Sequence, residues 1–275
     1  MTASVDRPPS PAAPALAATA AYHIGRQGMA LQPAFDAAVV MPTILRPELA
    51  RAVRSVFAQE GVGRIHLLVG VDKAVGDRAV LDAVRADVPD GVLVTVLDPG
   101  YSTSERHGGR HPAHDGGAMR TILSYLANAR YVAYLDDDNW WAPNHLSSML
   151  DAVRDRDWAF SLRWFVDPEN GKPLVIDGLE SVGPGRGGYG RTMGGWVDPN
   201  CLMIDAAVCE PAFRLWCHPL LNDGTNMSAD RQVFNALKDS TQVGETGEAT
   251  VFYTMNTDDP VHEKRMAWIK GQAGR

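Results

Sequence analysis

Residues 131–146 read YVAYLDDDNWWAPNHL, and this stretch places three adjacent aspartates directly after a run of strand-forming residues. Adjacent carboxylates repel one another, so stability alone does not account for such a cluster. The apolar run 131–135 predicts a buried strand, which puts the aspartates, residues 136–138, at its carboxyl end. Carboxylate oxygens are hard ligands that suit Mg²⁺ or Mn²⁺. The stretch therefore favours a metal site over its alternative, an acidic turn that caps the next helix through Asp138 or Asn139.

The bulk composition is that of an ordinary globular protein, with 45% hydrophobic and 21% charged residues among 275. The net charge of −7 argues against a nucleic-acid partner, because nucleic-acid-binding domains usually carry a basic face. No apolar run is long enough to span a bilayer, and the N-terminus lacks the pattern of a secretory signal. We expect a cytoplasmic protein, either free or peripheral to the inner face of a membrane.

The ends of the chain and its cysteines set the predicted domain organisation. Residues 1–33 are rich in Ala and Pro and are expected to form a disordered leader before one domain, residues 34–275. Cys201, Cys209 and Cys217 lack the close pairing of a zinc site, and their odd number does not suggest a disulfide framework. Free thiols in a reducing cytoplasm are the simplest interpretation. The oligomeric state stays open.

Upstream of the acidic stretch, apolar runs alternate with amphipathic segments. The predicted strands are 37–41, 64–72 and 91–98, and the predicted helices are 46–59, 77–88 and a segment within 117–129. This order predicts an α/β, Rossmann-like fold, with a mixed, mostly parallel sheet flanked by helices. Ligands bind beyond the carboxyl ends of the strands in such sheets, where Pro42, Thr43, Asp72 and Asp98 join the aspartates.

The second half of the chain predicts a different kind of sheet. Strands are expected at 158–167 and 173–177, with an antiparallel arrangement, and at 196–205 and 249–256. The predicted helices are 144–155, 228–239 and 259–272. The sequence shows no internal repeat and no clear interdomain linker.

Several segments together resemble family 2 glycosyltransferases of the GT-A fold. The acidic stretch resembles the strand and Asp-x-Asp segment of that family, while VVMPTILRPELARAVRSVFAQ (39–59) and LLVGVDKAVGD (67–77) resemble its first strand and helix and its second strand. Arg120 and ANARYV (127–132) match a further segment more loosely, with Thr121 in place of the usual Asn. The resemblance covers about residues 37–235, and the acidic stretch is its most specific part.

The resemblance implies a metal-dependent enzyme that moves a sugar from a nucleotide-diphospho-sugar to an acceptor hydroxyl with inversion. A UDP-sugar is the favoured donor, Mn²⁺ or Mg²⁺ the expected ion, and the acceptor a glycan, lipid or small molecule. Asp138 would contact the metal most directly, and Asp136 the donor ribose or the water shell of the metal. Asp137 would lie against the donor or only support the turn. The implied donor contacts also include Pro42, Thr43, Asp72 and Arg120.

An inverting enzyme needs a base that takes the proton of the acceptor hydroxyl. In the resembled family this base lies in a Glu-Asp pair at the start of a late helix, where this chain has NMSADRQVF (226–234). Asp230 is the candidate, and Ala229 replaces the Glu. The alternative is that Asp230 is a helix N-terminal charge favoured by the dipole. Asp223 is the second candidate for the base.

The glycine-rich stretch SVGPGRGGYGRTMGGW (181–196) predicts a mobile loop. It lacks the Gly-Lys-Ser/Thr of a phosphate-binding P-loop. The resemblance implies a lid beside the acceptor, in which Arg186 and Arg191 meet the diphosphate or an anionic acceptor. Gly194, Gly195 and Trp196 would line the sugar. The alternative is a surface loop with two solvated arginines.

The histidines divide into two groups. The resemblance makes His262, which follows the last predicted strand, a candidate to complete the metal shell, against the alternative of a surface helix residue. His107, His111 and His114, with Asp115, are loosely spaced like zinc ligands, but a solvated polar loop is the favoured interpretation.

The sequence leaves two other functions open. A sugar-nucleotide nucleotidyltransferase shares the sheet and the metal chemistry, but such enzymes usually open with a glycine-rich, basic loop where this chain has PTILRPEL (42–49). A non-catalytic nucleotide-sugar or metal-binding module would keep the aspartates and need no base.

Overall fold

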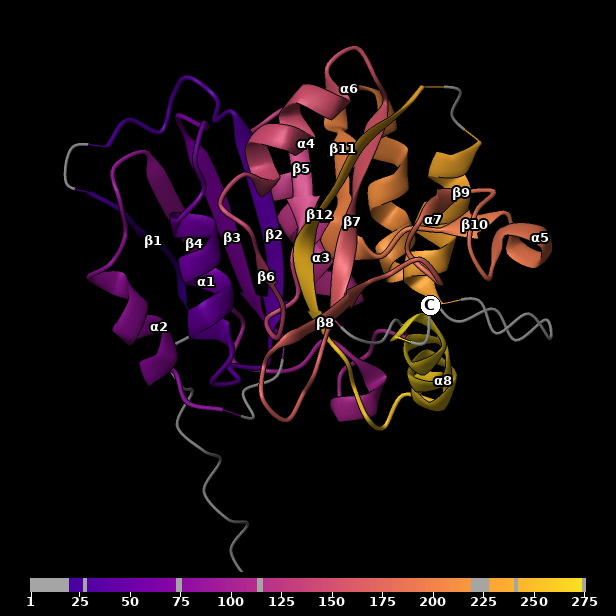
Figure 1. Ribbon diagram of the computed structural model, residues 1–275. Helices are drawn as coiled ribbons and strands as arrows, with labels where there is room; N and C mark the ends of the chain where they lie inside the picture. Colours follow the sequence, from indigo (N-terminus) through magenta and orange to yellow (C-terminus); the bar gives the residue numbers. More distant parts are fainter. Residues whose placement is uncertain are drawn as a thin grey trace, which may run out of the picture.

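The computed structural model describes residues 20–26, 29–72, 76–112, 116–218, 228–239 and 242–273. Within these residues, one sheet runs through the molecule in the order β1-β4-β3-β2-β5-β11-β7-β12-β6, and β8 pairs with β7 (Figure 1). Its strands are β1 Ala20–Ile24, β2 Ala37–Thr43, β3 Ile65–Val71, β4 Val92–Asp98, β5 Tyr131–Tyr134, β6 Trp140–Trp141, β7 Trp158–Val166, β8 Pro173–Ile176, β11 Leu202–Asp205 and β12 Val243–Thr254.

The helices cover both faces of this sheet. They are α1 Leu49–Phe57, α2 Ala79–Arg85, α3 Gly117–Leu126, α4 His145–Val153, α5 Gly190–Met193, α6 Ala206–Cys209, α7 Ala229–Lys238 and α8 His262–Ala273, with 3₁₀ segments η1 Glu105–His107, η2 Pro199–Cys201 and η3 Glu210–Cys217. Figure 1 shows α1 and α2 in front of the first half of the sheet and α3 behind it. No helix among the described residues has the length and apolar character to cross a membrane.

The first half of the sheet is parallel, as the sequence predicts. β4, β3, β2 and β5 pair in parallel, and every residue of β2 and β3 is buried. Burial on both faces explains why these strands are continuous apolar runs rather than alternating ones. Their carboxyl ends therefore meet at one edge of the sheet, where the polar residues that follow each strand converge.

The second half of the sheet is mixed. β11 is antiparallel to both β5 and β7, and β8 is antiparallel to β7, which agrees with the predicted antiparallel arrangement. β12 instead pairs with β7 in parallel. One cluster of buried hydrophobic side chains extends through both halves, from Ile24 in β1 to Val251 in β12.

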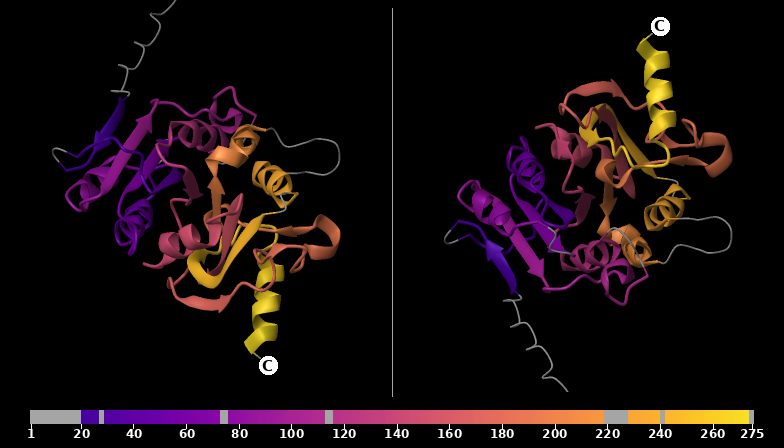
Figure 2. Two further views of the ribbon diagram at one scale, coloured as in Figure 1. Left: turned by 90° about the horizontal axis from the view of Figure 1, so that it is seen from above. Right: turned by 90° about the horizontal axis from the view of Figure 1, so that it is seen from below.

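The N-terminal boundary differs from the prediction of a disordered leader over residues 1–33. Ala20–Ile24 form β1, which pairs antiparallel with β4 at the edge of the sheet. A strand of five residues is too short to carry a clear periodic pattern in the sequence. Its backbone pairs with the edge of β4, whose N–H and C=O groups would otherwise be unpaired. Figure 2 shows this edge strand in indigo, on the side of the sheet away from the yellow helix α8. Residues 1–19 lie outside the described part.

The glycine-rich stretch forms a small ribbon rather than an irregular loop. β9 Gly183–Pro184 pairs antiparallel with β10 Gly195–Trp196, and the short helix α5 lies between them. Gly195 has φ 92°, and a Cβ there would lie 2.2 Å from the carbonyl oxygen of Gly183. The glycines thus allow a left-handed backbone conformation and a close approach of the two strands. The sequence pattern alone does not distinguish these roles of glycine from a mobile loop.

Candidate active site

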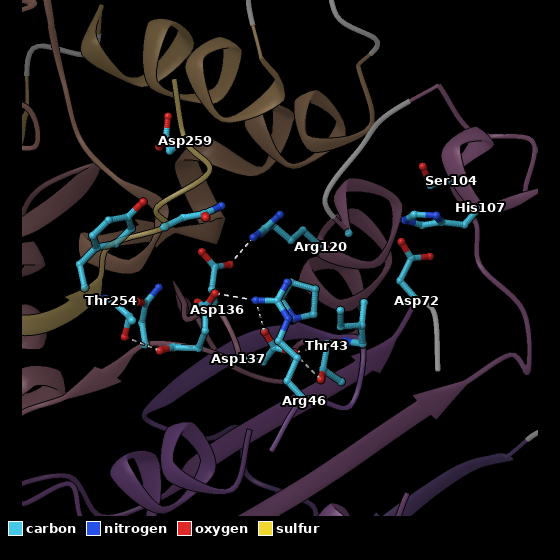
Figure 3. A pocket seen from close by; sticks show the side chains of 17 residues that line it. Thr43, Arg46, Asp72, Ser104, His107, Arg120, Asp136, Asp137, Thr254 and Asp259 are labelled. Carbon is cyan, nitrogen blue, oxygen red and sulfur yellow. Dashed lines mark hydrogen bonds and ion pairs between the residues drawn. The ribbon is translucent and has the colours of Figure 1, made fainter. Parts of the chain in front are cut away.

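A cavity of about 380 Å³ lies at the carboxyl ends of β2, β3 and β5 (Figure 3). The fold brings together here the side chains predicted from four separate segments of the sequence. The predicted residues that line the cavity are Pro42, Thr43, Asp72, Arg120, Asp136, Asp137 and Asp138. Because parallel strands end at one edge, residues far apart in the chain share this cavity.

Asp137 is buried and holds the loop after β2 in place. Its Oδ2 accepts hydrogen bonds from Thr43 Oγ1 at 2.7 Å and from the backbone N–H of Ile44 at 3.2 Å. Burial raises the pKa of the Asp137 carboxyl, while these two donors and Arg46 act in the opposite direction. The carboxylate of Asp137 is thus bound to the neighbouring chain segment.

Asp136 is oriented by Asn200, a fully buried residue in η2. Asn200 accepts the backbone N–H of Asp136 at 2.7 Å through Oδ1 and donates to Asp136 Oδ2 at 2.9 Å through Nδ2. The Asn200 amide also donates to Asp198 Oδ1 at 2.6 Å, and Arg120 pairs with the other carboxylate oxygen of Asp136. Both oxygens of Asp136 are therefore held at the cavity wall.

Asp138 carries the most perturbed carboxylate of the three aspartates. Its Oδ2 accepts from Arg46 Nη1 at 2.6 Å, and its backbone carbonyl accepts from Arg51 and from Thr254 at 2.9 Å each. Burial, followed by the charge of Asp136 and then that of Asp137, raises the pKa of Asp138 to about 7. Burial disfavours the charged carboxylate, and the two neighbouring aspartates disfavour it further, while Arg46 acts in the opposite direction.

The acidic cluster fits a divalent ion in its chemistry. Asp136 and Asp138 both line the cavity and offer hard oxygen donors, and a bound cation would offset the mutual repulsion of the neighbouring carboxylates, which contributes to the raised pKa of Asp138. Among the described residues, no three His, Cys, Asp or Glu side chains already converge as a ready metal site. Two protein carboxylates together with the oxygens of a diphosphate would supply enough ligands for a divalent ion.

A second cavity of about 370 Å³ adjoins the first, since Arg120, Asp136 and Tyr253 line both. Asp230 lines this second cavity from the first turn of α7. Its Oδ1 accepts from Ser228 Oγ and from the backbone N–H of Arg231. Burial raises the pKa of Asp230, which makes its carboxylate a stronger base than a solvated one. The position is consistent with both interpretations, a base and a helix N-terminal charge.

A buried ionic network supports the site from behind. Arg163 pairs with Asp177 at 2.8 Å, Glu180 at 2.8 Å and Asp198 at 2.6 Å, and these partners raise its pKa despite burial. Because Asp198 binds Asn200, the network continues to Asp136 at the cavity. Three carboxylates around one guanidinium satisfy its donors, which a buried charge requires.

Three predicted residues lie apart from both cavities. Arg191 lies in the exposed helix α5, and His262 begins α8. Trp196 is buried and packs edge-on against Phe234, with the Arg231 guanidinium 4.4 Å from its ring centroid. The segment 183–196 places Trp196 against Phe234 of α7 and leaves Arg191 exposed, so neither side chain lines the cavity of the aspartates.

The remaining arginine and histidine candidates lie in different surroundings. Arg186 forms an ion pair with Glu245 at 2.9 Å, away from the cavities. His107 belongs to the loop interpreted as solvated, yet it lines the first cavity beside Asp72 and Ser104 (Figure 3). His111 forms an isolated bridge with Ser104. His114, Asp115 and Asp223 lie outside the described residues.

Several residues that line the two cavities were not predicted from the sequence. They are Arg46, Ser104, Tyr253, Thr254, Asn256 and Asp259 in the first cavity, and Arg106, Trp216 and His218 in the second. The sequence offered a local indication for Arg46, because this residue follows the predicted donor contact Pro42-Thr43 by three positions. Residues 253–259 reach the cavity only through the pairing of β12, which no local pattern specifies.

The sequence matches no known family model and no curated protein. Solved structures are similar in fold. Residues 1–349 of S. aureus TarS in complex with UDP align with a TM-score of 0.55 and 13% identity, over 80% of this chain and 61% of that one. The UDP-GlcNAc complex of TarS gives 0.54 and 12%, over 82% and 60%. The longer TarS chain gives 0.53 and 13%, over 86% and 39%.

TarS is a glycosyltransferase. The present chain has the GT-A fold of glycosyltransferases. The expected fold class is therefore confirmed. The chain spans about three fifths of the length of the TarS 1–349 structures it matches. At this identity the similarity establishes the fold alone.

Proposed function

We propose that this chain is a metal-dependent glycosyltransferase, similar to family 2, that transfers a sugar from a UDP-sugar to an acceptor hydroxyl with inversion. The observation that carries the proposal is the pair of adjoining cavities, one with Thr43, Asp72 and the aspartates and the other with Asp230. A donor and an acceptor that filled them would meet at Asp136 and Arg120, which line both. The binding of UDP and of UDP-GlcNAc by TarS supports the choice of donor.

The first cavity would hold the donor. Asp72 Oδ1 accepts from Thr103 Oγ1 at 2.6 Å and from the Thr103 N–H at 2.7 Å, which fixes the carboxylate. Asp72 Oδ2 would then accept an N–H of the base or a hydroxyl of the ribose. Asp136 and Asp138 would hold Mn²⁺ or Mg²⁺, and the ion supplies positive charge against the departing diphosphate.

The second cavity would hold the acceptor. Asp230 takes the proton of the acceptor hydroxyl, and the oxygen forms a bond to the anomeric carbon from the face opposite the diphosphate. The bond from that carbon to the phosphate oxygen breaks, and its electron pair leaves with UDP. Arg120, between the two cavities, stabilises the negative charge that develops on the leaving group.

The decisive experiment measures donor hydrolysis across a panel of UDP-sugars, with Mn²⁺ and with a chelator. We expect release of UDP from at least one donor only with the ion, and a fall of about 100-fold or more in Asp138→Asn, because charge stabilisation is usually the largest catalytic contribution. Asp151→Asn makes the same substitution at an exposed position paired with Arg154 and should match the wild type.

Each other outcome has a definite meaning. Full turnover of Asp138→Asn with Mn²⁺ would show that the site assignment is wrong. Binding of UDP-sugars without turnover, in the presence of any acceptor tested, would favour a non-catalytic binding module. Formation of a UDP-sugar from UTP and a sugar phosphate would favour a nucleotidyltransferase. Arg191, Trp196 and His262 remain predictions as donor or metal contacts, and cytoplasmic location remains a prediction as well.

A further inference from the structure

The acidic cluster already carries a cation of the protein itself. Arg46 Nη1 lies 2.6 Å from Asp138 Oδ2 and 3.8 Å from Asp137 Oδ1. Asp138 is the residue that the proposed function assigns as the most direct metal ligand. A guanidinium at hydrogen-bond distance from that oxygen takes a position that a divalent ion would need, because two cations on one carboxylate oxygen repel strongly.

The backbone beneath Arg46 is fixed while its side chain is accessible. Thr43 Oγ1 and the Ile44 N–H bind Asp137, and the Leu45 N–H donates to Thr43 Oγ1 at 2.8 Å. Leu45 is 1% exposed and has φ 64°. The Arg46 side chain is 44% exposed. The backbone of Arg46 is therefore anchored, while its long side chain lines the first cavity and remains partly exposed.

The same cavity is the one that would hold the diphosphate of the donor. Arginine recognises phosphate oxygens through paired N–H donors, and this contact suits a guanidinium released from a carboxylate. Arg51, the next arginine along the chain, binds the Asp138 backbone carbonyl and lies over the Trp140 ring at 3.8 Å. Arg51 is thus held in place, whereas the contacts of Arg46 are with the acidic cluster itself.

We propose that Arg46 is an exchangeable counter-ion of Asp138, which excludes a divalent ion from the unliganded site and moves to the donor diphosphate when the ion binds. The proposal rests on the proposed function. It makes ion and nucleotide binding mutually dependent, because the ion must displace Arg46 and the displaced guanidinium gains a partner only when a diphosphate is present.

The test measures Mn²⁺ and UDP binding by calorimetry in wild type and in Arg46→Gln. Without nucleotide, Arg46→Gln should bind Mn²⁺ about 10-fold more tightly than the wild type, because its competitor is gone. With saturating Mn²⁺, the same variant should bind UDP about 10-fold more weakly, because a phosphate contact is lost. Arg54→Gln removes the same charge from an exposed arginine that pairs with Asp87, and should change neither affinity.

A second variant separates charge from shape. Arg46→Lys keeps a cation that still competes with Mn²⁺, so its affinity for Mn²⁺ should stay within about 3-fold of wild type while UDP binding weakens, since an ammonium lacks the paired donors. Equal Mn²⁺ affinity in wild type and Arg46→Gln would overturn this inference alone. Absence of Mn²⁺ binding in every variant, with and without UDP, would overturn the metal-dependent function as well.

Discussion

Asp136, Asp137 and Asp138 are neighbours in the chain, yet each carboxylate is held by a different part of the molecule. Asp137 binds the loop after β2, Asp136 binds Asn200 from η2, and Asp138 binds Arg46. The partners lie between 64 and 94 positions away in the sequence. The pattern of residues 131–146 therefore predicts a carboxylate cluster at a strand end, but the division of roles depends on tertiary contacts.

The role of Asp230 can be separated from its alternative by one substitution. Asp230→Asn keeps the size and polarity of the side chain but removes the base, so transfer should fall by about 100-fold or more while UDP affinity is unchanged. Steady-state rates and calorimetric titration of UDP with Mn²⁺ measure the two quantities. If Asp230 is only a helix N-terminal charge, the variant loses about 0.3–1 kcal/mol of stability and keeps its transfer rate. A loss of UDP affinity would instead assign Asp230 to the donor site.

At the scale of elements, the sequence predicts the parallel strands, and it also predicts which residues their carboxyl ends bring together. Continuous apolar runs identify β2, β3, β4 and β5, and the geometry of a parallel sheet then places Pro42-Thr43, Asp72 and the aspartates together. The same rule also placed Asp98 at this edge, but Asp98 pairs with Arg78 and does not line the first cavity.

The antiparallel half of the sheet was less predictable, because the residues that it adds to the site depend on pairing between strands that are distant in the sequence. β11 is inserted between β5 and β7, and this pairing is what brings η2 and Asn200 to the aspartates. Pro199, which lacks an N–H, breaks the strand predicted for residues 196–205 at that point. The glycine-rich stretch was interpreted as a lid, although its glycines also allow β9 and β10 to approach closely, and Trp196 of β10 lies in the core.

The contact between η2 and β5 gives a prediction for Asn200. Asn200→Ala removes the acceptor of the Asp136 N–H and the donor to its carboxylate, and leaves Asp198 with one partner fewer. We expect the affinity for Mn²⁺ in the presence of UDP to fall about 10- to 100-fold, as for other residues that orient metal ligands. Stability should fall by about 1–3 kcal/mol, because buried polar groups lose their partners.

Calorimetry gives the affinity for Mn²⁺ and urea unfolding gives the stability of the Asn200→Ala variant. Asn144→Ala is the matched control. Asn144 is exposed and donates to Glu248 at 2.8 Å, so its removal should leave both values within error. Unchanged Mn²⁺ affinity in a folded Asn200→Ala protein would show that Asn200 supports the fold but not the position of Asp136.

At the scale of the whole molecule, buried polar groups connect elements that are distant in sequence. Arg265 in α8 pairs with Glu180 at 2.9 Å and with Asp259 at 2.8 Å, and Glu180 also binds Arg163 in β7. Ion pairs thus connect helix α8 to the sheet. Asp259, one of the partners of Arg265, lines the first cavity. Such buried networks are fully formed only in the folded state, so they make the assembly of the site depend on the fold as a unit.

Two buried histidines belong to this framework and carry no charge in the folded protein. The Nδ1 of His66 accepts the Asn128 N–H at 3.1 Å, which requires that Nδ1 be unprotonated, and Nε2 then donates to Thr95 Oγ1 at 2.8 Å. Burial, with a smaller effect of His23, lowers the pKa of His66 to about 4. Burial alone lowers the pKa of His145 to about 3.

These values predict that each histidine lowers the stability of the protein on mild acidification, while Asp138, whose pKa is raised to about 7, contributes in the opposite direction. Above pH 6.5, the ordinary pKa of histidine, neither the folded nor the unfolded state gains a proton at these residues. Below it, the unfolded chain takes up protons that the folded protein excludes until about pH 4 for His66 and pH 3 for His145, so the free energy of unfolding decreases as the pH falls. Each histidine contributes a slope of about 1.4 kcal/mol per pH unit within its window.

Urea unfolding between pH 7 and pH 5 measures this slope above the range in which most carboxylates titrate. His145→Gln removes one of the two imidazoles, so its free energy of unfolding should decline less steeply than that of the wild type, by about 1.4 kcal/mol per pH unit below pH 6.5. The comparison of slopes is insensitive to a constant loss of stability from the missing contact with Thr250. Equal slopes in wild type and His145→Gln would mean that His145 takes up a proton in the folded state over this range, contrary to its buried position.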